Sequence, residues 1–189
     1  MGDVISMSST QRLIDWCIAT AADFGVPLEV TIEPSLDGNM YMCLDEHPRR
    51  LIISESQLHY PRSLQTWFWH EMGHAILPPP LPCHFSLAEF CTLLLTTGIL
   101  LPMLLSVYLP ISFVIGLILG WLGYPTYWWS MRQWEFQADM FMAENVGLES
   151  ALYALSECNA IDLGPFSDHP GAKRRMDRVI DAALKNGLL

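Results

Sequence analysis

The N-terminal part of the chain carries apolar residues three to four positions apart, which is the spacing of an amphipathic helix. Ser8 and Gln11 stand at capping-box spacing ahead of this stripe, and Gly25 and Pro27 follow it. We therefore expect a helix that begins near Ser8 and ends before Gly25. The apolar stripe comprises Leu13, Ile14, Cys17, Ala21 and Phe24.

Three short segments with strand features follow this helix. Residues 28–32 alternate apolar and polar side chains, which is typical of a half-buried strand, and residues 37–39 are a turn signal. Residues 40–44 and 50–54 are predicted to be two further strands. Short strands beside helices predict an α+β fold class, mainly helical with a small β-sheet.

Most of the remaining chain has helical character. The helix that begins at Pro61 is expected to end at the triple proline of residues 78–80, because proline lacks the amide donor and clashes with the preceding turn. Three further helices are predicted after the middle of the chain. They cover residues 133–145, 148–157 and 170–184.

The segment between Glu89 and Arg132 contains no charged residue. A membrane-spanning helix needs about 20 apolar residues, so two spans fit here, at residues 90–108 and 111–129, with a turn near Leu109-Pro110. We therefore expect a transmembrane hairpin, residues 90–129, inserted into a single domain that covers residues 1–189. The alternative is a hairpin that is buried inside a soluble protein.

Basic residues flank this hairpin on both sides, and its turn has none. Arg49, Arg50 and Arg62 precede the hairpin, while Arg132 and the Lys173 cluster follow it. The positive-inside rule then places both flanks in the cytoplasm. The sequence predicts an integral membrane protein in contact with the lipid bilayer, with its catalytic domain on the cytoplasmic side.

Charge and cysteine content exclude two classes of function. The net charge of −10, with 20 acidic and 10 basic residues, argues against nucleic acid as a partner, because no broad phosphate-binding surface is available. The basic cluster at residues 173–178 is either a solvated helix face or a functional group of residues. Five cysteines without repeated spacing argue against a disulfide framework and against a thiolate zinc site.

The most specific chemical signal is the run His70-Glu71-Met72-Gly73-His74, which has the form H-E-x-x-H. Residues i and i+4 share one face of a helix, so the two imidazoles can bind one metal ion. Glu71 is then placed to act as general base toward a water activated by the metal. The pattern predicts a Zn²⁺ hydrolase that still needs a third ligand.

Two later motifs supply candidates for the rest of the site. Glu135 and Asp139 are four residues apart on a predicted helix, so Glu135 can bind the metal while Asp139 accepts a hydrogen bond from a ligand imidazole. Without the first motif this pair would indicate a solvated helix face. His169 and Arg175 offer hydrogen-bonding groups for a developing oxyanion, although His169 fits a helix cap or loop equally well.

The order H-E-x-x-H, uncharged hairpin, E-x-x-A-D and H-P-x-x-x-x-R resembles the HtpX-like membrane zinc metallopeptidases, which are related to the type 1 CaaX prenyl endopeptidases. The resemblance covers roughly residues 39–184 and implies a zincin-type (gluzincin-like) metallopeptidase domain. It also implies that His70, His74 and Glu135 bind zinc, that Glu71 is the catalytic base, and that the other two motif residues lie near the substrate. Those two residues are His169 and Arg175.

The function expected from this resemblance is a membrane-associated zinc metalloendopeptidase. Its partners would be a protein or peptide substrate, membrane proteins included. Two alternatives remain open: a soluble cytosolic zinc metallopeptidase of the repressor-cleaving type, and a non-catalytic membrane scaffold that retains the metal fold. Glu71 argues against the scaffold, because a purely structural zinc site does not require a general base.

Overall fold

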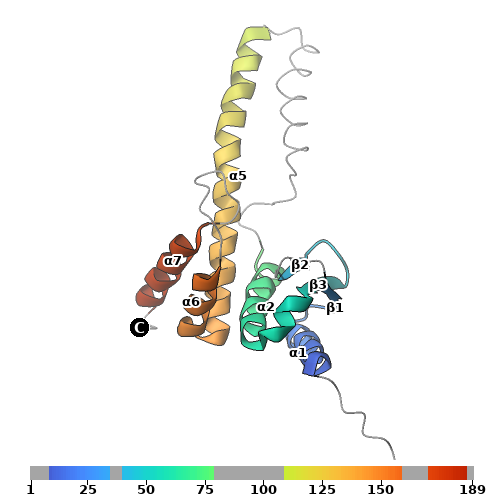
Figure 1. Cartoon of the computed structure of the whole chain (residues 1–189). Coiled ribbons are helices and arrows are strands. Elements are labelled where there is room, and N and C mark those ends of the chain that lie inside the picture. The colour runs from blue at the N-terminus through green and yellow to red at the C-terminus, as the bar shows by residue number, and fades with distance from the viewer. Residues whose placement is uncertain (1–8, 35–39, 79–108, 159–169, 187–189) are drawn as a thin grey trace, which may run out of the picture. The chain divides into compact units, whose positions relative to one another are not determined.

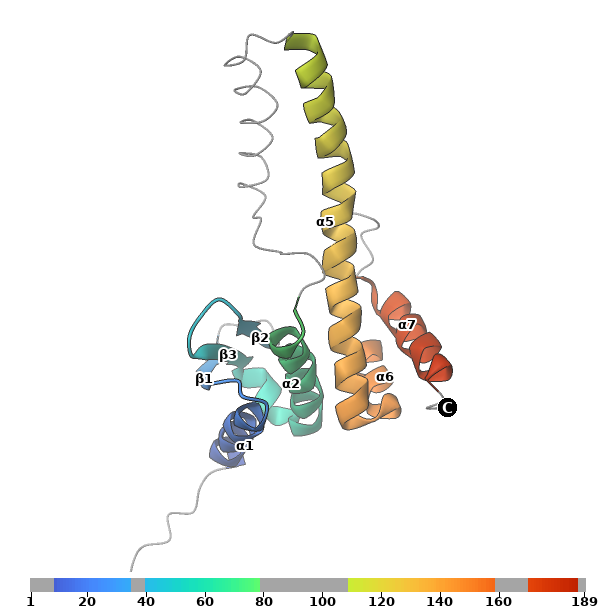
Figure 2. The same ribbon diagram turned by 180° about the vertical axis from the view of Figure 1, so that it is seen from behind.

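The computed structural model describes residues 9–34, 40–78, 109–158 and 170–186 (Figures 1 and 2). Helix α1 (Ser9–Asp23) leads into strands β1 (Leu28–Glu33), β2 (Met40–Cys43) and β3 (Arg49–Ser54). A short 3₁₀ turn, η1 (Glu55–His59), precedes the remaining helices. These are α2 (Pro61–Ile76), α5 (Leu109–Val146), α6 (Leu148–Glu157) and α7 (Ala172–Lys185).

The chain divides into two compact units. The first comprises residues 1–78, 135–159 and 172–189, and the second comprises residues 79–134 and 160–171. The candidate site residues on α2, α5, α7 and β2 all belong to the first unit. The first unit is therefore the part of the molecule that positions the site.

The sheet of the first unit has the strand order β1-β3-β2. The central strand β3 pairs in parallel with β1, where Val30 lies opposite Leu51, and antiparallel with β2, where Met42 also lies opposite Leu51. Strand β2 is consequently an edge strand. The predicted strand positions are confirmed within a residue at each end, because period-two alternation and turn residues define short strands well.

Two apolar clusters hold the first unit together. In the first, α1 and α2 pack on the sheet through Cys17, Leu51 and Phe68, and the Trp16 and Phe68 rings lie 5.0 Å apart. In the second, the C-terminal part of α5 packs with α6 and α7 through Met142, Leu155 and Val179. Trp69 of α2 packs against both clusters, so α2 joins the sheet side to the helical side.

Local sequence explains how α2 presents its two faces. Pro61 occupies the first turn, where its missing amide donor does no harm, and the helix ends at Ile76, with Leu77 as its C-cap just before the prolines. Leu64, Phe68 and Met72 recur every four residues and are buried in the sheet-side cluster. The H-E-x-x-H histidines therefore lie on a different face of α2 from this apolar stripe.

The predicted fold class, a zincin-type domain with an inserted transmembrane hairpin, was wrong. The described residues are mostly helical with a three-stranded sheet, which does not establish a zincin fold. None of the described helices combines the length and the apolar character needed to cross a bilayer.

The hairpin prediction rested on an uncharged stretch long enough for two spans and on the aromatic residues at one end of it. An uncharged run is necessary for a membrane span but is also compatible with other environments. The first predicted span, residues 90–108, lies outside the described residues. The second, residues 111–129, is not a separate element, because it is part of α5, which continues to Val146.

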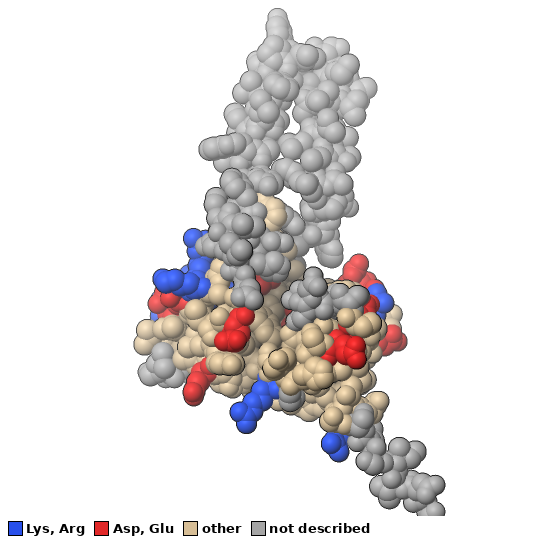
Figure 3. All heavy atoms as spheres, viewed as in Figure 1, with Lys and Arg blue, Asp and Glu red and all other residues tan. Residues whose placement is uncertain are grey.

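Acidic and basic side chains are interspersed on the face of the molecule shown in Figure 3. Among the described residues on that face, basic side chains form no broad continuous surface. This distribution agrees with the net charge of −10.

Candidate metal centre

The two histidines of the H-E-x-x-H run lie one turn apart on α2 and face each other. His70 Nε2 and His74 Nε2 are 3.2 Å apart, and the two rings are nearly perpendicular. Both imidazoles are largely removed from solvent, since their side chains are 6% and 9% exposed. The helical spacing therefore brings two nitrogen donors to one point, as the sequence predicted.

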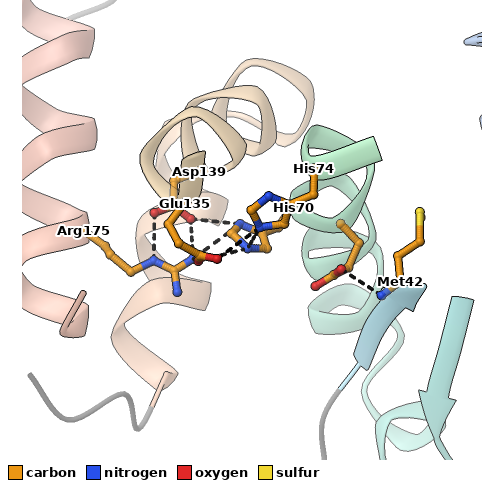
Figure 4. A network of polar contacts seen from close by, with 7 residues as sticks. Met42, His70, His74, Glu135, Asp139 and Arg175 are labelled. Atoms are coloured by element: carbon orange, nitrogen blue, oxygen red, sulfur yellow. Dashed lines mark hydrogen bonds and ion pairs between the residues drawn. The ribbon is translucent and has the colours of Figure 1, made fainter. Parts of the chain in front are cut away.

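Glu135 of α5 completes this group of donors. Its Oε1 lies 3.2 Å from His74 Nε2, and its Oε2 lies 3.5 Å from His70 Nε2. One ligand atom from each of the three residues falls within 4.8 Å of the others, and Figure 4 shows the side chains converging from the two helices. The structure thus brings together the three residues predicted as metal ligands.

The distances between these donors fit a zinc ion. Ligands at 2.0–2.1 Å from a tetrahedral zinc lie about 3.3 Å from one another. The two histidine nitrogens are 3.2 Å apart, and the two oxygens of Glu135 lie one beside each of them, at 3.2 Å from His74 Nε2 and 3.5 Å from His70 Nε2. Imidazole nitrogen and carboxylate oxygen are also the donor types that zinc accepts. The residues present therefore fit this metal in chemistry, and one donor atom from each lies within 4.8 Å of the others.

A close approach of two backbones lets the donors meet. A Cβ atom added at Gly73 would lie 2.8 Å from Ala138 Cα and 3.1 Å from Ala138 Cβ. Because the first of these contacts, with a backbone atom, is shorter than real Cβ contacts, a larger residue at position 73 would force the two helices to shift. The sequence prediction missed this pair, although a small residue inside each of the two motifs was the available signal.

Asp139 lies beside His70, as predicted. Its Oδ1 is 3.0 Å from His70 Nδ1, and the side chain is fully buried. Burial lowers the pKa of His70, but its contacts with Asp139 and Glu135 outweigh that effect and raise the pKa to about 9. Because Asp139 contacts Nδ1, His70 Nε2 is left to face Glu135 and His74.

Arg175 of α7 is buried and pairs with Asp139 instead of facing solvent. Its Nε and Nη2 donate to Asp139 Oδ2 and Oδ1 at 2.8 and 2.5 Å, which is a bidentate pairing. Burial is the largest single effect and raises the pKa of Asp139, but the hydrogen bonds and charges of Arg175 and His70 together bring this pKa below its ordinary value. The sequence had suggested a place near the substrate for Arg175, but the structure buries its side chain to 3% exposure. His169, the other residue of that motif, lies outside the described residues.

Glu71 is held on the sheet side of α2. Its Oε2 accepts a hydrogen bond of 3.0 Å from the backbone N–H of Met42, on the edge strand β2. Burial raises the pKa of the Glu71 carboxyl, and the neighbouring His70 and His74 partly offset this effect. Met42 was not predicted as part of the site, because its contribution is a backbone amide and leaves no trace in side-chain identity.

Comparison with known proteins adds no relative to this description. No family model, characterised protein or solved structure matches the chain. The resemblance to the HtpX-like peptidases therefore stays a prediction, carried by the three motifs.

Proposed function

We propose that this chain is a zinc-dependent peptidase that hydrolyses peptide bonds in protein or peptide substrates. The observation that carries the proposal is the convergence of His70, His74 and Glu135, which bring one ligand atom each to within 4.8 Å of the others. Glu71 follows the first ligand directly in the sequence. The order of the motifs supports peptides as the substrate class.

Three protein donors leave one position of a tetrahedral ion open, which is the arrangement of catalytic rather than structural zinc sites. Bound zinc supplies Lewis-acid chemistry and makes water nucleophilic near neutral pH. The chain's own contribution is the orientation of the ligands and the placement of a base. Asp139 orients His70, while the peptide amide of Met42 holds the Glu71 carboxylate.

Glu71 is the proposed general base. A carboxylate with a raised pKa is a better proton acceptor than an ordinary surface carboxylate, because the catalytic optimum lies near the working pH. Glu71 would accept the proton of the attacking water and return it to the leaving amine when the peptide bond breaks. The Met42 amide fixes the carboxylate for both transfers.

The experiment compares the Glu71→Gln variant with the unaltered chain, both loaded with zinc, in cleavage of an unfolded test protein. Glutamine keeps the size of the side chain but cannot accept the proton. We expect the rate to fall by about 100-fold or more, with zinc content unchanged, since general bases contribute roughly 10²–10⁴. Glu144→Gln, an exposed carboxylate of α5, is the matched control and should cleave normally.

Undiminished cleavage by Glu71→Gln with zinc still bound would show that Glu71 is not the base. Zinc uptake without any cleavage, in the unaltered chain as well as in both variants, would instead indicate an ion with a structural role.

A further inference from the structure

Helix α7 contributes no candidate metal ligand, yet one of its side chains reaches the centre of the site. Arg175 forms the bidentate pair with Asp139, and the same Nη2 lies 3.3 Å from His70 Nδ1 and 3.6 Å from Glu135 Oε2. A single guanidinium therefore faces one proposed ligand from each of the two ligand-bearing helices. Figure 4 shows Arg175 approaching Asp139 from the side of α7.

We infer that Arg175 is a positioning residue of the metal site, and that the docking of α7 and the binding of the metal are thermodynamically coupled through it. This inference rests on the proposed metal site. It gives Arg175 a role that acts through Asp139, His70 and Glu135 rather than through contact with substrate.

The geometry requires an arginine rather than any cation. The planar guanidinium presents Nε and Nη2 in a fixed fork that matches the two oxygens of Asp139, while the lysine ammonium is a point charge without that shape. The guanidinium also packs over the Trp67 ring, whose centroid lies 5.7 Å from the guanidinium carbon. The Trp67 ring in turn is nearly perpendicular to the His70 imidazole. The two hydrogen bonds from Arg175 and its packing over Trp67 together fix the orientation of the Asp139 carboxylate.

The packing of α7 explains why its docking sets the position of Arg175. Its buried residues are Arg175, Val179 and Ala183, which recur every four positions along one face. Val179 belongs to the apolar cluster with Met142 of α5 and Leu155 of α6. The helix therefore inserts two apolar side chains and one cation as a single stripe, so Arg175 can reach Asp139 only when α7 is docked.

Coupling follows from linkage. If docked α7 favours the ligand geometry that binds zinc, bound zinc must stabilise the docking of α7 by the same factor. The effect is directional, because α1 packs in the sheet-side cluster and makes no contact with this network among the contacts described. Zinc should therefore protect α7 more than α1.

The main test measures zinc affinity by competition with a chelator for the unaltered chain, Arg175→Met and Arg175→Lys. Residues that orient metal ligands typically change affinity by about 10- to 100-fold, and we expect a loss in this range for Arg175→Met. Arg175→Lys keeps the charge and the fold but loses the fork, so it should still bind about tenfold more weakly. Lys173→Met, which removes an exposed cation of the same helix that pairs only with Asp177 in the described part of the chain, is the matched control and should bind as the unaltered chain does.

A second readout separates positioning from a merely structural role. The visible spectrum of the Co²⁺-substituted protein reports ligand geometry, and it should change in Arg175→Lys while remaining unchanged in Lys173→Met. Hydrogen exchange should show that zinc slows the amides of α7 more than those of α1, and that this difference disappears in Arg175→Lys. If Arg175→Met does not fold, the lysine variant carries the test alone.

The outcomes distinguish this inference from the proposed function. If the unaltered chain binds zinc and cleaves protein while Arg175→Lys matches it in zinc affinity, Co²⁺ spectrum and exchange, only the positioning role is overturned. If the unaltered chain takes up no zinc, the proposed function and the coupling fail together.

Discussion

Gly73 and Ala138 stand at the same place in their two motifs and meet where α2 and α5 approach each other. Gly73 follows His70 by three residues and precedes His74 by one, and Ala138 has the same relation to Glu135 and Asp139. A Cβ at Gly73 would come within 2.8 Å of Ala138 Cα. The close approach is therefore centred between the functional residues of each helix.

Gly73→Ala should consequently push α2 and α5 apart. The obstructing atom is backbone, so the helices themselves must shift, and overpacking of this kind typically destabilises by about 1–3 kcal/mol. Alanine gains up to about 1 kcal/mol in helix propensity over glycine, which reduces the net loss. We expect a lower thermal midpoint together with weaker zinc binding, measured by calorimetry and by chelator competition.

The companion variant Ala138→Gly sharpens this test. Because the closest atom is Ala138 Cα, removing the Ala138 side chain should not restore zinc binding to the Gly73→Ala chain. Full restoration by the double substitution would mean that the helices are held apart by side chains alone, contrary to the structure.

Replacement of Glu135 tests the third ligand. With Glu135→Ala only the two histidines remain, and we expect zinc content after dialysis to fall from about one ion per chain to near zero, since catalytic zinc sites use three protein ligands. Glu144→Ala removes an exposed carboxylate from the same helix and should retain its zinc. Metal analysis of the two proteins side by side is the measurement. Equal zinc content would place the third ligand elsewhere.

The metal-free chain should lose stability as the pH rises. The pKa of His70 in the fold is about 9 against an ordinary 6.5, so the folded state holds this proton more tightly. The stabilisation is complete below pH 6.5 and is lost as the pH rises through about 9, with an upper limit on the order of 3 kcal/mol. Thermal unfolding after chelation should show the decline.

His70→Gln provides the control for this pH dependence, since glutamine does not titrate. Glu71 also has a raised pKa and acts in the same direction, so the comparison must be made against the variant. An equally steep decline in His70→Gln would assign the effect to another group.

The sequence was sufficient to locate the strands and the two histidines of the candidate metal centre, because both depend on local periodicity. The alternation of residues 28–32 and the i, i+4 spacing of His70 and His74 are each visible within one element. The choice of Glu135 also agreed with the structure, which groups it with the two histidines. In a chain that contains an H-E-x-x-H run, a later helical pair of carboxylates four residues apart is an uncommon pattern, and this is why Glu135 could be chosen.

Relations between distant elements were not accessible from the sequence. Arg175 pairs with Asp139 across 36 positions, and an arginine at the start of a helix gives no sign that it will be buried. The Met42 amide contact with Glu71 depends on β2 being an edge strand, which follows from the strand order β1-β3-β2. The membrane hairpin was wrong although the stretch is uncharged and long, since none of the described helices is long and apolar enough to cross a bilayer.

The most direct measurement of the central claim is anomalous diffraction at the zinc edge from crystals of the unaltered chain grown with one equivalent of zinc. The account predicts a single strong peak about 2.0–2.2 Å from His70 Nε2, His74 Nε2 and the Glu135 carboxylate. A peak on other residues, or no peak among these three, would contradict it.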